Sequence, residues 1–516
     1  MANDDGKTPK SGGRIEGGLD AIVIGASLDG LAAAALLGKA GLRTVLLGAG
    51  GAGLDDEKRE FAPGFFAIDG EPLVTHLDPE LAGALDLYRH GLAFANRRLD
   101  SVYYFSDGGA LLMEGDLYKT RESVAAMAVG DAEPFAEFVE QALDAARALR
   151  PFLEGGAPPA LAEPISSVSD FYLAAAVEDV VEDAFADPHL KALLSAEAAL
   201  RSAVRPSEPF GFAALIARWA GEAAGLQAGA AYAEGGAAGV RRALRRAAQA
   251  AKVDFRPSVS VSRALIEWDR AAGVETSEGG QIRAPVIVNA LPARAAFLDL
   301  IGPSLLDIEF TAALSAPKPV FASARVHFAI RGEPSDERGA ANLSRRLVYA
   351  PDKDAIARAY AAARRGEVAA PLIMEALFPS AFDPSLAPEG AHVASALLHP
   401  VPFRAEADAG LKATIAAAAR ATFAEVAPGI ADRIEAVDIR LASDEAAASG
   451  APAEIFAAAP SVIDAWARAR RIAAASGVEG YFFCGPEAQI APFPSGAAGR
   501  RAARAAARHH RTRAHP

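Results

Sequence analysis

The first pattern along the chain is a short apolar run, a turn of small residues, and a helix rich in Ala and Leu. Ala21 to Ile24 predict a buried parallel strand, and Leu28 to about Ala40 predict a helix that Gly41 ends. Arg43 to Leu47 predict a second strand. A strand, a helix and a strand in this order indicate a βαβ unit with a dinucleotide-binding turn after its first strand.

Beyond this unit the pattern alternates between helical and strand-like periods. From about residue 86 to 225 it is mostly helical, with apolar residues three and four apart over Ala132 to Leu153. Val253 to Trp268 alternate as a strand does, and Ala284 to Pro292 and Gly480 to Pro486 predict further strands. Residues 305–465 mix strands with helices, and Ser495 to His510 open a C-terminal helix. The sequence therefore predicts an α/β protein.

The predicted nucleotide turn departs from G-x-G-x-x-G. It reads Gly25-Ala26-Ser27-Leu28-Asp29-Gly30, so Ser27 stands where a glycine would let the backbone approach a phosphate. Asp29 lies beside the anion, points to solvent or caps a helix N–H group. Gly48 ends the second strand, where an acidic residue would hold the ribose at about 1.5–3 kcal/mol per hydrogen bond. The turn therefore predicts either a weakened dinucleotide site or a purely structural turn.

Composition excludes several classes of protein. A length of 516 residues predicts two or three domains, and a net charge of −13 argues against nucleic-acid binding. The single Cys484 excludes an internal disulfide, and the nine histidines lack metal-ligand spacing, so no metal is expected. Residues 1–19 are polar and glycine-rich, which predicts a disordered tail rather than a signal peptide. We therefore expect a cytoplasmic protein.

Eight separated motifs lie between about residue 18 and residue 508. They are the βαβ unit, Phe61 to Phe65, Gly235-Gly236, the strands at Val253–Val261 and Val286–Pro292, Pro379 to Val393, Cys484-Gly485, and Ser495 to Gly499. Taken together and in this order, they resemble the motifs of the phytoene-dehydrogenase-like FAD-dependent oxidoreductases. That family includes carotenoid desaturases, isomerases and pyridine nucleotide-disulfide oxidoreductase-domain proteins.

The resemblance implies a discontinuous Rossmann-like FAD-binding domain from residues 20–85, 225–300 and 470–510. Residues 86–224 and 301–469 would form a mixed α+β substrate domain. The implied cofactor is FAD. The residues expected at it are Gly25, Ala26, Ser27 and Gly30 at the pyrophosphate, Val259 with its backbone at the adenine, and Gly485, Gly496 and Ala497 near the ribityl chain and isoalloxazine.

The implied activity is oxidation, desaturation or isomerisation of a small apolar, polyene or carotenoid-like substrate, with hydride transfer to flavin. No catalytic residue is predicted, because the cofactor supplies the reactivity. One alternative is a cofactor-poor, non-catalytic descendant that acts as a binding protein, which Ser27, Gly48 and the altered segment 50–60 favour. The other is an NAD-dependent dehydrogenase, which the C-terminal flavin-like motif disfavours. If FAD binds weakly, replacing Ser27 by Gly and Gly48 by Glu should raise its affinity about tenfold.

Other polar residues have structural interpretations. Cys484 is expected in the core, and His392 and His399 are expected to be satisfied or exposed rather than catalytic. The Ala-, Phe- and Leu-rich inserts, such as Phe210 to Ala220, predict a substrate domain lined by apolar side chains and few ionisable groups. A row of arginines predicts a solvated end of the last helix, with a weak membrane-surface contact as the alternative. These are Arg500, Arg501, Arg504, Arg508 and Arg511.

Overall fold

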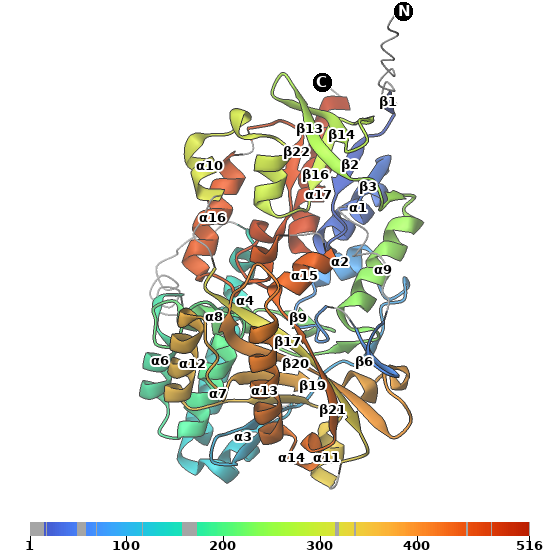
Figure 1. Cartoon of the computed structure of the whole chain (residues 1–516). Helices are drawn as coiled ribbons and strands as arrows, with labels where there is room; N and C mark the ends of the chain where they lie inside the picture. Colours follow the sequence, from blue (N-terminus) through green and yellow to red (C-terminus); the bar gives the residue numbers. More distant parts are fainter. Residues whose placement is uncertain are drawn as a thin grey trace, which may run out of the picture.

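The structure is a computed structural model with two sheet-based parts, one above the other in Figure 1. It describes residues 15–16, 18–48, 58–68, 70–115, 117–156, 173–314, 319–334, 337–449, 452–475 and 477–514. The upper part joins the blue N-terminal strands, the green and yellow middle of the chain, and the red C-terminal helix. The lower part holds the largest sheet and most of the helices.

A parallel sheet of order β12-β3-β2-β16-β22 forms the centre of the upper part. Three of its strands are buried along their whole length because layers cover both of their faces. The strands are β2 (Ala21–Ile24), β3 (Thr44–Leu47), β12 (Asp254–Arg256), β16 (Val286–Asn289) and β22 (Tyr481–Phe483). One face packs on α1 (Leu28–Lys39), α9 (Gly236–Ala250) and α17 (Ala497–Ala514). The predicted Rossmann-like βαβ unit is confirmed.

A four-stranded sheet covers the other face of the parallel sheet. Its strands β13 (Val261–Glu267), β14 (Arg270–Thr276) and β15 (Gln281–Arg283) form an antiparallel meander. Strand β1 (Ile15–Glu16) pairs in parallel with β15. These two residues are therefore ordered within the tail predicted as disordered, while residues 1–14 and 17 lie outside the described residues.

The lower sheet has the order β21-β17-β20-β19-β18-β7-β8. It is antiparallel except between β18 and β7. The strands are β7 (Ser101–Tyr104), β8 (Ala110–Met113), β17 (Phe321–Arg331), β18 (Arg346–Tyr349), β19 (Ile373–Leu377), β20 (Ala391–Pro402) and β21 (Ile434–Arg440). Its outer face packs on α13 (Ala409–Val426), where Phe328 stacks on Phe423 at a 4.4 Å centroid distance.

The opposite, inner face of the lower sheet is turned toward a group of helices. These are α3 (Leu117–Met127), α4 (Ala132–Leu153), α6 (Val177–Ala184), α7 (Pro188–Ala199), α8 (Gly211–Trp219) and α12 (Lys353–Arg365). Helix α4 has the limits that its apolar spacing predicts. Shorter elements used below are β4 (Arg59–Ala62), β5 (Phe65–Ala67) and α2 (Pro79–Ala84).

Candidate cofactor site and buried sheet face

The turn between β2 and α1 has the compact form that dinucleotide-binding folds use. Gly25 has φ +96°, and a Cβ atom on Gly30 would lie 2.1 Å from the Gly25 carbonyl oxygen. Both residues therefore must be glycine for the helix to start this close to the strand. Ala26 packs partly against the core beneath the turn.

Ser27 acts as the N-cap of α1. Its exposed side chain accepts a hydrogen bond from the Gly30 N–H at 3.2 Å. A helix N-terminus binds phosphate through such free N–H groups. In this chain the Gly30 N–H is already bound by the Ser27 hydroxyl. A glycine at position 27 would leave that N–H group free to bind a phosphate.

The end of β3 is closed by the neighbouring strand. A Cβ atom on Gly48 would lie 2.3 Å from the Pro257 carbonyl oxygen and 2.8 Å from the Pro257 Cα. No side chain fits there, so the prediction that Gly48→Glu restores a ribose contact is wrong. Val259, whose backbone is expected at the adenine, follows Pro257 by two residues. Its N–H donates to the Arg256 carbonyl oxygen at 3.2 Å.

Asp29 contacts α17, a second helix whose N-terminus lies at this end of the parallel sheet. It is buried, and its carboxylate accepts a hydrogen bond from the Gly499 N–H, at the start of α17, at 2.9 Å. Burial raises the pKa of the Asp29 carboxyl to about 6, although the Gly499 and Ala498 N–H groups and Arg501 oppose that shift. A carboxylate therefore occupies the N-terminus of α17, where the resemblance implies the flavin side of a cofactor.

The predicted C-terminal contacts serve the packing of α17. Gly496 has φ +87°, and a Cβ atom there would lie 2.3 Å from the Leu81 side chain and 3.0 Å from that of Leu28. The buried Ala497 donates its N–H to the Ser495 hydroxyl at 3.3 Å. At Gly485 a Cβ atom would lie 2.0 Å from the Leu291 carbonyl oxygen. Side chains and backbone of the protein thus fill the space beside all three residues.

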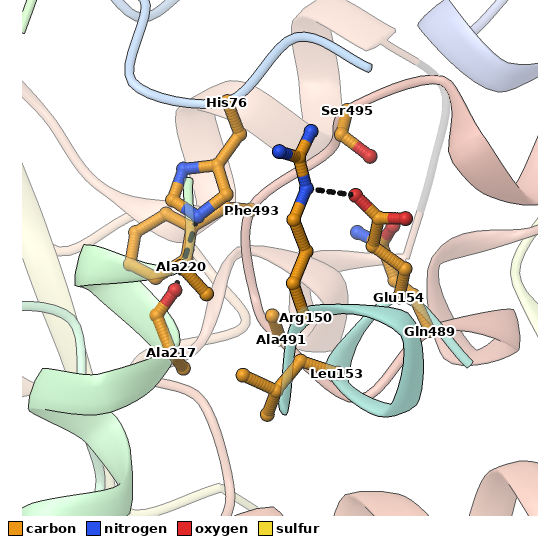
Figure 2. A pocket seen from close by; sticks show the side chains of 10 residues that line it. All are labelled: His76, Arg150, Leu153, Glu154, Ala217, Ala220, Gln489, Ala491, Phe493 and Ser495. Atoms are coloured by element: carbon orange, nitrogen blue, oxygen red, sulfur yellow. Dashed lines mark hydrogen bonds and ion pairs between the residues drawn. The ribbon is translucent and has the colours of Figure 1, made fainter. Parts of the chain in front are cut away.

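The loop before α17 packs tightly against the helices of the lower part. Figure 2 shows the His76 ring over Phe493; their centroids are 4.4 Å apart and their planes 8° from parallel. His76 also bonds the Ala217 carbonyl oxygen at 3.1 Å, and burial lowers its pKa to about 3. The cavity beside this pair has a volume of about 10 Å³, which is room for one water molecule.

These contacts test whether FAD fits the described residues. The structure brings Gly25, Ser27, Gly30, Gly485 and Gly496 together at the ends of β2, β16 and β22, as the resemblance implies. The strand end that should hold ribose accepts no side chain, however, and both helix N-termini are capped from within. The arrangement does not fit tightly bound FAD. Residues 49–57, most of the altered 50–60 segment, lie outside the described residues.

Comparisons with known proteins define the class of fold. No family model matches the sequence. A pyridine nucleotide-disulfide oxidoreductase domain-containing protein 2 from Rattus norvegicus is 25% identical over 94% of this chain and 92% of its own length. An oxidoreductase from Methanosarcina mazei is 16% identical, with a TM-score of 0.60 over 94% of this chain and 99% of that one.

A second similar structure is that of putrescine oxidase bound to putrescine. It is 16% identical and has a TM-score of 0.63, with 96% of this chain and 99% of that chain covered. At this level of identity the solved structures show the fold alone. The chain thus has the fold of FAD-dependent oxidoreductases and resembles the pyridine nucleotide-disulfide oxidoreductase-domain proteins along nearly its whole length.

Several single residues can be compared with their predictions. Cys484 is buried, and burial raises the pKa of its thiol, so the core interpretation is confirmed. His399 is satisfied by Ser323, Tyr360 and the Ser202 carbonyl, also as predicted. The prediction of a solvated arginine face is wrong at its first residue. Arg500 is buried and pairs with Asp78 and Glu80 at the start of α2. No helix in the described part of the chain is long and apolar enough to span a membrane.

The largest difference from the sequence interpretation lies on the inner face of the lower sheet. There Arg346 bonds Glu197 and Glu375 at 2.6 Å each, and Tyr103 donates to Glu197 at 2.8 Å. Arg218 joins the same two carboxylates, at 2.5 Å and 2.8 Å. Burial alone would raise the pKa of Glu375, yet the surrounding arginines hold it well below its usual range. The expectation of few ionisable groups in this domain is therefore wrong.

This ionic network continues toward the edge of the inner face. Glu71 accepts hydrogen bonds from Arg201 at 2.5 Å and 2.6 Å and from Arg325 at 2.9 Å. A signal for it was present in the sequence. Arg325 and Glu375 are charged residues in otherwise apolar strands, and a charge at such a position is rarely buried unless it is paired.

Proposed function

We propose that this chain is a non-catalytic, ligand-binding protein built on the fold of FAD-dependent oxidoreductases. The observation that carries the proposal is the closed end of β3, where Gly48 lies against the Pro257 backbone. The capping of α17 by Asp29 supports the same conclusion, because a buried carboxylate already occupies the helix N-terminus that the resemblance places beside the flavin. A cytoplasmic location and the absence of nucleic-acid partners remain predictions that belong to this proposal.

Titration of FAD into the purified full chain by isothermal calorimetry tests the proposal. We expect no saturable binding in the wild type or in Asp29→Asn, because the ribose contact is missing in both. Asp29→Asn removes the buried charge and keeps an oxygen acceptor for Gly499, so it is the variant in which a hidden site would appear. Micromolar or tighter binding to either protein would contradict the proposal.

A second candidate is FAD-dependent oxidation of a small apolar, polyene-like substrate. It is supported by the preserved turn, with Gly25 at φ +96°, and by relatives named as oxidoreductases over nearly the full chain. Its test is oxidation of a polyene with FAD added to the purified protein. Substrate turnover that depends on added FAD would favour this candidate over the non-catalytic one.

A further inference from the structure

The inner face of the lower sheet carries buried nitrogen atoms without partners. Among the described residues, no hydrogen-bond partner is present for Arg325 Nε and Nη1, Arg201 Nε or His327 Nε2. The His327 side chain is 1% exposed, and Arg325 is 14% exposed. A buried donor without an acceptor costs about 1–3 kcal/mol, so such a cluster indicates a missing group.

The charges of the network indicate the sign of that missing group. In its fully buried part, Arg218 and Arg346 balance Glu197 and Glu375. At its edge the single carboxylate of Glu71 is shared by two guanidinium groups, those of Arg201 and Arg325. Two nearby arginines have carboxylates of their own, in the pairs Arg59–Asp438 and Arg440–Glu445. The edge of the network therefore carries one positive charge in excess.

Strand geometry places two of the unpartnered groups side by side. Arg325 and His327 are two residues apart on β17, so they leave the same face of the sheet about 7 Å from each other. His327 Nδ1 lies 2.9 Å from the Ser395 hydroxyl, which can donate to it and leave Nε2–H free to donate. Burial lowers the pKa of His327, and Arg325, Arg59 and Arg440 lower it further, so the ring is a neutral donor.

We infer that this edge of the inner face binds the carboxylate of an amphipathic organic acid, between the Arg325 guanidinium and His327 Nε2. One unpartnered Arg325 nitrogen supplies a charge-assisted hydrogen bond to the carboxylate, and His327 Nε2–H supplies a second. The Phe61 ring, 5.8 Å from that of His327, and the buried Phe65 lie beside the site and suit an apolar chain. The inference rests on the proposed function for its role in ligand binding. FAD binding would sink the proposed function and leave this site standing.

Calorimetric titration of octanoate and of octan-1-ol into the full chain in chloride-free buffer tests the site. We expect saturable octanoate binding and binding of the alcohol at least about tenfold weaker, because only the acid supplies the negative charge. Arg325→Met should weaken octanoate binding about tenfold or more. Arg263→Met is the control, since Arg263 is an exposed, ion-paired arginine on β13, away from the lower sheet, and its loss should leave the affinity unchanged.

Further measurements distinguish charge recognition from folding effects. Arg325→Lys keeps the positive charge but loses the planar guanidinium, so its affinity for octanoate should lie between those of wild type and Arg325→Met. If Arg325→Met fails to fold, the Lys variant still tests the site, because it should bind octanoate more weakly than wild type. Isotope-labelled histidine NMR should show the His327 Nε2 resonance shift on addition of octanoate. Equal binding of acid and alcohol, unchanged affinity in both Arg325 variants, or binding of chloride but not octanoate would overturn the inference.

Discussion

The nucleotide end of the parallel sheet and the inner face of the lower sheet treat their polar groups in opposite ways. At the nucleotide end the groups satisfy one another: Ser27 with Gly30, Asp29 with Gly499, and Ser495 with Ala497. On the inner face, Arg325, Arg201 and His327 keep buried nitrogen atoms without partners in the described chain. Because buried polar groups are nearly always paired, the first region needs no ligand and the second does.

The two sheets of this chain use their polar groups for different purposes. The strand-turn-helix geometry at Gly25 persists because it holds α1 and α17 against the sheet, whether or not a cofactor is present. The inner face combines a balanced ionic centre with an unbalanced edge. Single substitutions in each region therefore test the difference between them.

Removing a carboxylate from the centre of the ionic network should have the largest effect on stability. Glu375→Gln leaves Arg346 and Arg218 without one of their shared buried charges. Breaking a buried ion pair in this way costs about 3–5 kcal/mol, measured by urea denaturation. Glu367→Gln is the control, because the exposed Glu367–Arg365 pair should contribute nothing measurable. Equal stability of Glu375→Gln and wild type would show that the network is not buried as described.

Filling the contact between α1 and α17 should destabilise the fold rather than a cofactor site. A Cβ atom on Gly499 would lie 2.0 Å from the Asp29 carbonyl oxygen, so Gly499→Leu should cost about 3 kcal/mol or more. Gly83→Ala in α2 meets nothing within 4 Å and should be tolerated. Thermal unfolding of both variants makes the comparison. A stable Gly499→Leu protein would mean that the helices are not in contact.

Asp29 should give the nucleotide end a dependence on pH. Its pKa is raised from 3.8 to about 6 in the folded chain, so its contribution is complete below the unfolded pKa and is lost as pH rises through about 6. Asp29→Asn should therefore be more stable than wild type near neutral pH, by at most about 3 kcal/mol, and lose this advantage near pH 4. Denaturation midpoints across about pH 4–8 measure it. A difference independent of pH would contradict the buried carboxyl.

Removing the Ser27 cap should have the smallest effect. Ser27→Ala loses the acceptor for the Gly30 N–H and should cost about 1 kcal/mol. Ser27→Gly should cost only a few tenths of a kcal/mol, since glycine is tolerated at an N-cap. Chemical denaturation compares the two variants with wild type. A neutral Ser27→Ala change would mean that the hydroxyl faces something other than its own helix.

The sequence predicts the βαβ unit and the limits of α4 because their signals are local. Apolar periods and the glycine turn act within one or two elements. The closed strand end could not be predicted, since Gly48 meets Pro257 only when β3 and β12 pair. The ionic network could not be predicted either, because its partners come from β17, β18, β19, α7, α8 and a segment before α2. Its only local signal is a charged residue within an apolar strand.

The flavin content of freshly purified protein, released by heat and identified by mass, shows directly whether the nucleotide end holds a cofactor. The nucleotide end is filled by the chain's own side chains and backbone, so we expect no FAD above a trace, even when the protein is produced with abundant riboflavin. One FAD molecule per chain would contradict it, because a stoichiometric cofactor requires a cradle that Gly48 and Asp29 do not leave open.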